Sequence, residues 1–296
     1  MPAEESDAEP PTPQTPPTEG THSQSKPSAK WGTVVILDRL GTRAEWTQDP
    51  PGEALRRSKD RFEKAIRRFG ASDFATSFYV ADFSSSAAQS SLEAGTTWAY
   101  VDLSGAVSPV ISRFEVQVPS PPAGVIGFSD TIIAWREIGK TDMSAFERLC
   151  NDVIDFFNAT LVDGDFYRGV ISVGQFLPAD HAIFGPAVQE AGDWYEAFDW
   201  MGVSLTPSAE WFVRSSDRLQ DLRSAFVEFD LSPKGGAGHS KPPQSVSRVA
   251  LAWPRFLSGG RGELLGAFRK QLVSRDFENK YRNTLRFFED SIAASS

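Results

Sequence analysis

Two aspartates stand in apolar surroundings, and these are the residues best suited to do chemistry in this chain. Asp38 ends the run Thr33–Leu37, and Asp130 interrupts the apolar segment Val125–Trp135. Burying a carboxylate is costly unless a cation compensates its charge, and that cation can be a basic side chain or a metal ion. Either aspartate alone suits a buried salt bridge as well as a metal site. The pair together favours two hard metal ions, because Mg²⁺ and Mn²⁺ prefer oxygen ligands.

The residues after Asp38 have the composition of a turn that can bind phosphate. They are Arg39, Leu40, Gly41 and Thr42. Consecutive backbone N–H groups in a glycine-containing turn can donate to phosphate oxygens. The same four residues would also form an ordinary turn from a strand to a helix, so both interpretations stay open.

Other kinds of chemistry have less support. The single cysteine, Cys150, excludes an internal disulfide and a cysteine-based zinc site, and its spacing from Phe146 and Val153 predicts a buried thiol. Of the three histidines, only His181 lies near a predicted element, which argues against a histidine metal site or a Ser-His-Asp triad. The net charge of -9 argues against nucleic acid as a partner.

The first 30 residues differ in composition from the rest of the chain. Residues 1–30 are rich in Pro, Glu, Ser and Thr and have almost no large apolar side chain. Such a segment cannot bury enough apolar surface to offset its ordering entropy, so we expect a disordered tail that is not a signal peptide. No later apolar run is long enough to cross a bilayer, so we expect no membrane partner and a cytoplasmic location.

The apolar periodicity predicts the elements that must position the two aspartates. Strands are expected at Thr33–Leu37, Thr96–Leu103, Arg113–Val118, Tyr167–Phe176, Ala182–Phe184 and Val249–Trp253, with a hairpin over Val125–Trp135. Helices are expected at Leu55–Phe69, Phe146–Leu161 (capped by Asp142 and ended by Asp163-Gly164-Asp165), Val188–Phe198, Glu263–Val273 and Asn279–Ile292. This order predicts an α/β (α+β) fold close to the ferredoxin-like βαββαβ arrangement, followed by a C-terminal strand and helices.

Four motifs, in this order, resemble the class III nucleotide cyclase catalytic domain. The family has a strand ending in Asp with a Gly three residues later, a second Asp in a hairpin, an Arg-led strand ending in Gly, and a Gly-x-x-Val before a helical Ala. Here the motifs fall on Asp38–Gly41, Asp130, Arg168–Gly174, and Gly185 with Val188 and Ala191. The resemblance runs from Thr33 to about Ala209. It implies a catalytic domain over residues 31–209 and a C-terminal extension, residues 210–296, packed on that core.

The chain departs from the family where purine cyclases contact their substrate. The helical Asn and Arg that orient the ribose and stabilise charge in the family are Gln189 and Asp193 here. The two positions that read a purine base hold Ile126 and Ala182, neither of which can hydrogen-bond a purine edge. These departures suit a catalytically dead domain used for binding, or a divergent branch with another base pocket. The two retained aspartates favour the divergent branch.

Three further strings resemble the pyrimidine cyclases of bacterial anti-phage (Pycsar) systems. They are Phe184–Ala187, Leu251–Pro254 and Lys280–Thr284. This resemblance implies conversion of UTP to cyclic UMP, or of CTP to cyclic CMP, and an effector that responds to the product. Cyclic UMP is favoured on the resemblance alone, because no residue in the sequence reads one pyrimidine against the other.

The resemblance also assigns roles within the site. Two ions, Mn²⁺ or Mg²⁺, are expected on Asp38, Asp130 and the backbone carbonyl of Arg39. The nucleotide is expected to contact the backbone of Arg39, Leu40, Gly41 and Thr42 and the residues Ile126, Ala182 and Gln189. The reaction would be attack of the ribose 3′-oxygen on the α-phosphorus, with catalysis by positioning and charge neutralisation.

A cation must replace the missing helical arginine of the family. Arg43, Arg113 and Arg168 are the candidates, since guanidinium groups suit phosphate oxygens. Arg168 fits a structural role at a strand end equally well. Family members complete each site from two chains in a head-to-tail homodimer, so a twofold dimer is implied.

Two other functions stay open. A non-catalytic nucleotide-binding regulator would use the same fold without turnover. A two-metal nuclease or polymerase-like palm domain would also use paired carboxylates, but it would favour a basic channel for nucleic acid. The acidic balance of the chain speaks against that function.

Overall fold

The computed structural model of the chain describes most of the sequence after the predicted tail. The described residues are 28–41, 51–69, 76–82, 98–100, 110–116, 123–128, 130–139, 143–179, 182–216, 224–234, 245–270 and 277–294. Residues 1–27 of the predicted tail and the predicted cap Asp142 lie outside them. The first strand begins at Lys30, the last residue of the predicted tail.

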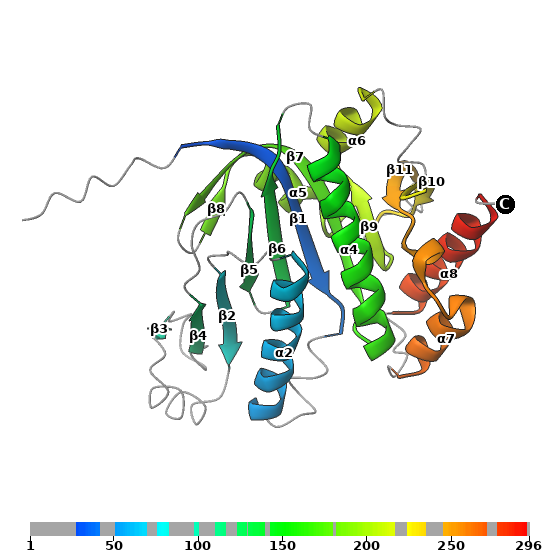
Figure 1. Cartoon of the computed structure of the whole chain (residues 1–296). Helices are drawn as coiled ribbons and strands as arrows, with labels where there is room; N and C mark the ends of the chain where they lie inside the picture. Colours follow the sequence, from blue (N-terminus) through cyan, green and yellow to red (C-terminus); the bar gives the residue numbers. More distant parts are fainter. Residues whose placement is uncertain are drawn as a thin grey trace, which may run out of the picture.

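The described residues form one mixed sheet of 11 strands, which runs through the structure (Figure 1). The strands are β1 (Lys30–Arg39), β2 (Thr76–Asp82), β3 (Trp98–Tyr100), β4 (Val110–Val116), β5 (Ala123–Phe128), β6 (Thr131–Glu137), β7 (Tyr167–Ala179), β8 (Ala182–Phe184), β9 (Gly202–Leu205), β10 (Phe226–Leu231) and β11 (Val246–Leu251). Their order is β10-β11-β9-β7-β1-β6-β5-β2-β4-β3, and β8 pairs with β7 off this path. β1 therefore lies between β7 and β6, inside the sheet.

The middle of the sheet confirms the predicted α/β (α+β) fold class. The chain runs through β1, helix α2 (Pro51–Phe69), β5, β6, helix α4 (Met143–Asp163) and β7, with β2, β3 and β4 inserted after α2. The four core strands lie in the order β7-β1-β6-β5, and every neighbouring pair is antiparallel. This is the ferredoxin-like βαββαβ arrangement. The inserted strands extend the sheet beyond β5, and β2 among them was not predicted.

Helices cover the two faces of the sheet. α2 and α4 lie on one face, and α5 (Pro186–Trp194) packs on the other, against β7 and β1 (Figure 1). Val35 and Leu37 of β1 join the core beneath α2 and α4, whereas Val34 and Ile36 pack with buried alanines of α5. Successive side chains of a strand point to opposite faces, so β1 serves both helical layers.

Helix α4 follows directly from its sequence pattern. The apolar residues predicted at helical spacing are buried, and they include Phe146, Leu149, Val153 and Phe157. The helix ends at Asp163, where Gly164 takes a φ of 90°, a left-handed conformation that favours glycine. The expected end of this helix at Asp163-Gly164-Asp165 is therefore confirmed.

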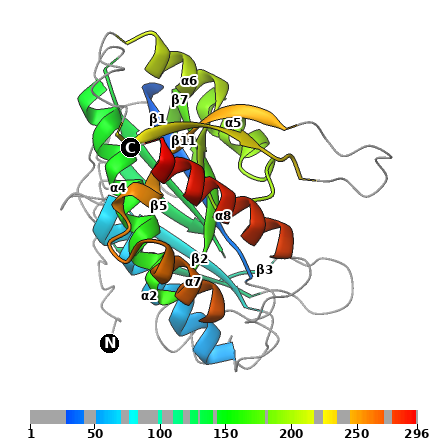
Figure 2. The same cartoon turned by 90° about the vertical axis from the view of Figure 1, so that its right-hand side faces the viewer.

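The C-terminal part extends the same sheet at its other edge. β9 pairs in parallel with β7, β11 pairs with β9, and β10 pairs with β11. This part also contains α6 (Pro207–Arg214), the short helix η1 (Trp253–Phe256), α7 (Gly260–Lys270) and α8 (Glu278–Ala293), of which α7 and α8 face the viewer in Figure 2. Phe287 on α8 packs edge-on against Trp200, with 4.9 Å between ring centroids. The boundary that the sequence resemblance implied between residues 31–209 and residues 210–296 falls inside α6.

Some elements differ from the predictions. β9, α6 and β10 were not predicted, because they span only 4, 8 and 6 residues and so offer no long periodic run. The helix predicted over Val188–Phe198 ends at Trp194, and Phe198 instead forms a β-bridge with Pro233. Among the described helices, none is both long and apolar enough to cross a membrane.

Candidate functional site

Asp38 lies at the carboxyl end of β1, inside the sheet. Its neighbours across the two ladders are Thr131 on β6 and Arg168 on β7. Alternation along the strand places its side chain on the α5 face, the face that Ile36 shares with α5. Asp38 is only 8% exposed. The fold therefore holds this carboxylate at the edge of an apolar layer.

Arg168 binds this carboxylate directly. Its Nε and Nη2 both donate to Oδ2 of Asp38, at 3.0 and 2.8 Å. Nη2 also donates to Glu196 at 2.9 Å, and Lys234 donates to the other carboxylate oxygen of Glu196 at 3.1 Å. The charges alternate from Asp38 to Lys234; the side chains of Asp38 and Arg168 are buried, and those of Glu196 and Lys234 are exposed. Oδ1 of Asp38 accepts none of these bonds.

The electrostatic environment of Asp38 disfavours its charged form. Burial raises the pKa of Asp38 from 3.8 to about 6; the Arg168 guanidinium opposes this shift, and the nearby Asp130 carboxylate adds to it. Asp130 lies in the turn between β5 and β6 and is partly buried. Burial likewise raises the pKa of the Tyr195 hydroxyl, with Glu196 and Asp38 adding to the shift. This part of the sheet therefore concentrates negative charge in a poorly solvated place.

Backbone hydrogen bonds fix the chain just after Asp38. The Arg39 amide donates to the Asp130 carbonyl at 2.9 Å, and the Leu40 amide donates to the Phe166 carbonyl at 2.8 Å. Both amides already donate hydrogen bonds within the protein. Of the four residues expected to donate backbone N–H groups to phosphate, only Gly41 and Thr42 therefore remain candidates. Gly41 has a φ of 90°, which favours glycine. Thr42 lies outside the described residues.

The two candidate metal-binding side chains are those of Asp38 and Asp130, and the Arg39 carbonyl follows Asp38 at the end of β1. Oxygen donors of this kind suit Mg²⁺ or Mn²⁺. Among the described residues, no three side chains of His, Cys, Asp and Glu form a metal-binding cluster. Remaining ligands would come from substrate phosphates and water, as is usual for Mg²⁺. Burial is the main cause of the raised pKa of Asp38, Arg168 opposes the shift and Asp130 adds to it, so a divalent cation beside the two carboxylates would favour the charged form, and the residues present fit such an ion.

Of the two predicted base-contacting residues, Ala182 lies far from the aspartates. Ile126 is 7% exposed and packs in an apolar cluster with Ile183, the neighbour of Ala182 on β8. Ala182 pairs with Ala179 at the far end of β7, roughly 35 Å of strand from Arg168. The structure thus brings Ile126 and the β8 segment together, but within one chain it does not bring Ala182 to Asp38. Gln189 is exposed on α5.

The three candidate arginines have different outcomes. Arg168 lies beside Asp38, so its predicted place at the site and its structural role at a strand end are both compatible with the geometry. Arg43 lies outside the described residues. Arg113 lies on β4, whose side chains lie outside the described part of the structure.

Sequence reasoning missed Tyr195, Glu196 and Lys234. Glu196 lies 28 positions from Arg168 and 38 positions from Lys234. The helix predicted over Val188–Phe198 included both Tyr195 and Glu196, and neither was assigned a place at the site. A shorter helix would have placed Tyr195 and Glu196 at its C-terminal end, but no residue type in the sequence signals that end.

No protein-family model matches the chain, and no curated protein matches it. Among solved structures, the chain is similar to the catalytic core of a rhodopsin-guanylyl cyclase with converted specificity in complex with ATPαS, at 9% identity and a TM-score of 0.40, over 77% of this chain and 98% of that chain. It is also similar to the adenylyl cyclase CyaB from P. aeruginosa, at 12% identity and a TM-score of 0.34, over 75% of this chain and 94% of that chain. A bacterial light-regulated adenylyl cyclase matches at 11% identity and a TM-score of 0.38, over 83% of this chain and 100% of that chain. These neighbours are nucleotide cyclases, and at such low identities and TM-scores the activity of this chain has to be judged from its own residues.

Proposed function

We propose that this protein is a nucleotide cyclase, which closes a nucleoside triphosphate into a cyclic monophosphate and releases pyrophosphate. Asp38 is the observation that carries the proposal. It is buried, its pKa is raised to about 6, and a second carboxylate, Asp130, is close enough to contribute to that shift. A carboxylate kept in such unfavourable surroundings is typical of a functional site. Paired carboxylates at the end of a central strand suit divalent ions bound together with a triphosphate.

The residues of the chain would position the triphosphate and neutralise its charge. Divalent ions, when bound, would supply positive charge at the phosphates and a lower pKa for the ribose 3′-hydroxyl. The Arg168 guanidinium lies beside Asp38, where it can face phosphate oxygens that approach the same edge of the sheet. Glu196 and Lys234 keep that guanidinium in one orientation. The turn at Gly41 would offer its backbone to the phosphates.

We further propose a pyrimidine substrate, with UTP and cyclic UMP favoured and CTP with cyclic CMP as the alternative. Ile126 lies among apolar side chains and Ala182 has no polar group, so neither position supplies the hydrogen bonds that read a purine edge. The preference for UTP, the role in anti-phage defence, the cytoplasmic location and an effector that responds to the product come from the sequence resemblance alone.

The proposal includes a homodimer. Ala182 lies far along β7 from Arg168, so a nucleotide that spans from the base position to the aspartates would need both parts from different chains. A head-to-tail twofold dimer supplies that combination. Phe128 on β5 and Phe184 on β8 are 52% and 58% exposed, and exposed aromatic side chains of this size suit burial in an interface.

The direct test is to incubate the purified full chain with each of the four nucleoside triphosphates and Mn²⁺, and then with Mg²⁺, and to identify products by mass. We expect a cyclic pyrimidine monophosphate, with cyclic UMP predominant. Cyclic AMP or cyclic GMP as the main product would overturn the base assignment and leave the cyclase assignment intact. Sedimentation of the same sample establishes whether the active species is a dimer.

A non-catalytic nucleotide-binding regulator is the second candidate, and one observation favours it. Arg168 already pairs with Asp38 through two hydrogen bonds, which is what a purely structural ion pair would look like. A folded dimer that binds nucleoside triphosphate but forms no cyclic product with either metal would establish this function instead.

A further inference from the structure

Arg39 connects the parts of the candidate site, and it and the next residue are held at three points. Its backbone amide donates to the Asp130 carbonyl at 2.9 Å, and the next amide, of Leu40, donates to the Phe166 carbonyl at 2.8 Å. Its side chain donates through Nε to Oδ1 of Asp165 at 2.8 Å, and Nη2 lies 2.8 Å from the same oxygen. One residue therefore links the Asp130 turn, the end of β1 and the turn between α4 and β7.

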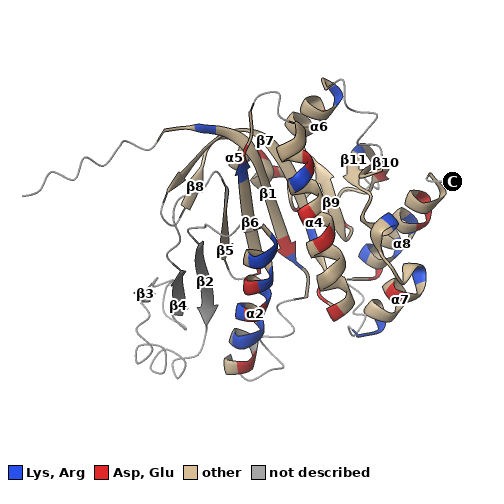
Figure 3. Ribbon diagram, in the orientation of Figure 1, with Lys and Arg blue, Asp and Glu red and all other residues tan. Residues whose placement is uncertain are grey.

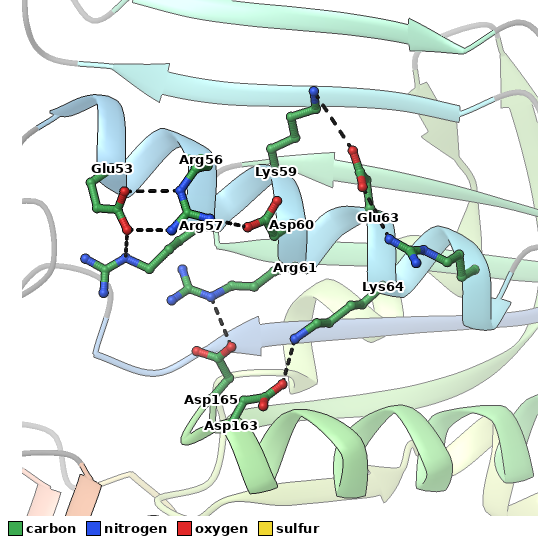
Figure 4. Close-up of polar contacts among 11 residues, drawn as sticks. Glu53, Arg56, Arg57, Lys59, Asp60, Arg61, Glu63, Lys64, Asp163 and Asp165 are labelled. Atoms are coloured by element: carbon green, nitrogen blue, oxygen red, sulfur yellow. Dashed lines mark hydrogen bonds and ion pairs between the residues drawn. The ribbon is translucent and has the colours of Figure 1, made fainter.

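Asp165 is the centre of a buried group of charges. It follows Gly164, its amide donates to the Thr160 carbonyl at 3.0 Å, and it is 9% exposed. Its second oxygen accepts from Nε of Arg61 on α2 at 3.1 Å (Figure 4). The Arg39 and Arg61 side chains are 3% and 11% exposed, so both cations are held in places where an unpaired charge would be costly. Asp165 thus ties α2, α4 and β1 together at one point.

This point of attachment lies directly next to Asp38 in the chain. Asp38 and Arg39 are adjacent in β1, and their side chains leave the strand on opposite faces. Fixing the Arg39 guanidinium on the α2 face fixes the peptide between the two residues, and with it the direction of the Asp38 carboxylate on the α5 face. The Arg39 amide also holds the Asp130 carbonyl. The relation between the two aspartates therefore depends on where Arg39 is held.

We propose that Asp165 is a positioning residue, which acts through Arg39 to set the geometry of the Asp38–Asp130 pair for a divalent cation. The inference rests on the proposed function for what the pair binds. Residues that orient metal ligands from behind change metal affinity or activity without touching the metal themselves. Asp165 would act in this way on Asp38, from behind and through Arg39. Its second carboxylate oxygen accepts a hydrogen bond from Arg61 on α2.

The chain contains a matched control for this role. Lys64 on α2 donates to Asp163 at the end of α4 at 2.6 Å, so this pair joins the same two elements (Figure 4). Its side chains are 45% and 51% exposed, and Arg39 is not among its partners. Asp163→Asn therefore removes a carboxylate from the same turn and leaves the attachment of Arg39 in place.

The experiment compares the full-length chain with the variants Asp165→Asn, Arg39→Lys and Asp163→Asn. Mn²⁺ affinity is measured with the metal alone by titration calorimetry, turnover is measured with UTP, and circular dichroism records folding and the melting temperature. We expect Asp165→Asn to weaken Mn²⁺ affinity or turnover by about 10- to 100-fold. Arg39→Lys keeps the charge but loses the guanidinium fork, so it should show a smaller loss in the same quantities. Asp163→Asn should stay within about twofold of the parent, as expected for an exposed pair.

A folded Asp165→Asn variant that melts earlier but keeps the Mn²⁺ affinity and turnover of Asp163→Asn would overturn the proposal, because a merely structural role predicts that result. If Asp165→Asn does not fold, Arg39→Lys decides, and an unchanged Mn²⁺ affinity and turnover in that variant would also overturn it. A parent chain that binds Mn²⁺ but makes no product contradicts the proposed function only, and the Mn²⁺ titrations still test Asp165. A parent chain that neither binds Mn²⁺ nor makes a cyclic product overturns both, and where product forms without measurable binding of the metal alone, the turnover comparison among the variants decides.

Discussion

Two neighbouring residues at the end of β1 lie in opposite electrostatic situations. Asp38, on the α5 face, has its pKa raised to about 6 by burial, with Asp130 adding to the shift, and Arg168 compensates it only in part. Arg39, on the α2 face, is almost fully buried and contacts Asp165 through two nitrogens. At this strand end, the surroundings of the Asp38 carboxylate disfavour its charged form, whereas the Arg39 guanidinium is paired with the Asp165 carboxylate.

This difference indicates separate roles: Asp38 belongs to the part of the strand end that would bind a cation, and the Arg39–Asp165 pair belongs to the part that anchors the strand. Negative charge that the protein does not neutralise by itself attracts a cation, whereas a satisfied ion pair serves as an anchor. Figure 3 shows that charged residues of both signs lie along α2, whereas the central strands carry few.

Removing either aspartate should have the largest effect. Asp38→Ala or Asp130→Ala takes away a shared oxygen ligand, so turnover should fall by more than about a hundredfold, beyond the range expected for residues that only orient ligands. Cyclic product is measured by mass with Mn²⁺ and UTP, and circular dichroism shows that each variant is folded. Near-normal turnover in either variant would make the two-metal assignment wrong.

Removing Arg168 should destabilise the protein. In Arg168→Met the Asp38 carboxylate remains buried without its guanidinium partner, so the free energy of unfolding should fall by about 3 kcal/mol. Denaturant titration measures this change. Arg214→Met is the matched control, because the Arg214–Glu228 pair has side chains 52% and 63% exposed, and its loss should cost less than about 1 kcal/mol. Equal losses in the two variants would show that Arg168 does not compensate a buried charge.

Metal affinity should depend on pH through Asp38. A protonated carboxyl is a poor ligand, so Mn²⁺ affinity should fall as pH falls through the Asp38 pKa of about 6. A group with that pKa is mostly charged at pH 7 and roughly one-tenth charged at pH 5, which predicts about a tenfold weaker affinity at pH 5. Calorimetric titrations with the metal alone measure it. A flat affinity between pH 7 and 5 would mean that Asp38 behaves as an ordinary exposed carboxyl.

Local patterns in the sequence were enough for the elements with long periodic or apolar runs. β1, the β5–β6 hairpin and α4 were predicted, and strand alternation alone places Asp38 and Arg39 on opposite faces. Local patterns could not predict which charged residue pairs with Asp38 or with Arg39, because both partners are distant in the sequence. Asp165 lies 126 positions from Arg39, and Arg168 lies 130 positions from Asp38. Asp165 was recognised only as part of a helix end, because its partner is set by the way α4 returns into β7.

The smallest effect is expected from shortening the N-terminus, which should leave both faces of the strand end unchanged. Residues 1–27 lie outside the described residues, and their composition offers no apolar face to dock. Their deletion should change turnover by less than about twofold and the free energy of unfolding by less than about 0.5 kcal/mol. Deletion through Thr33 is the matched contrast, because it removes the pairing of Gly32 with Gly174 and the hydrogen bond from Thr33 to the Ser172 carbonyl at 3.1 Å. That longer deletion should lower the melting temperature clearly, whereas a large loss of activity from the shorter one would place the tail in the site or in the dimer.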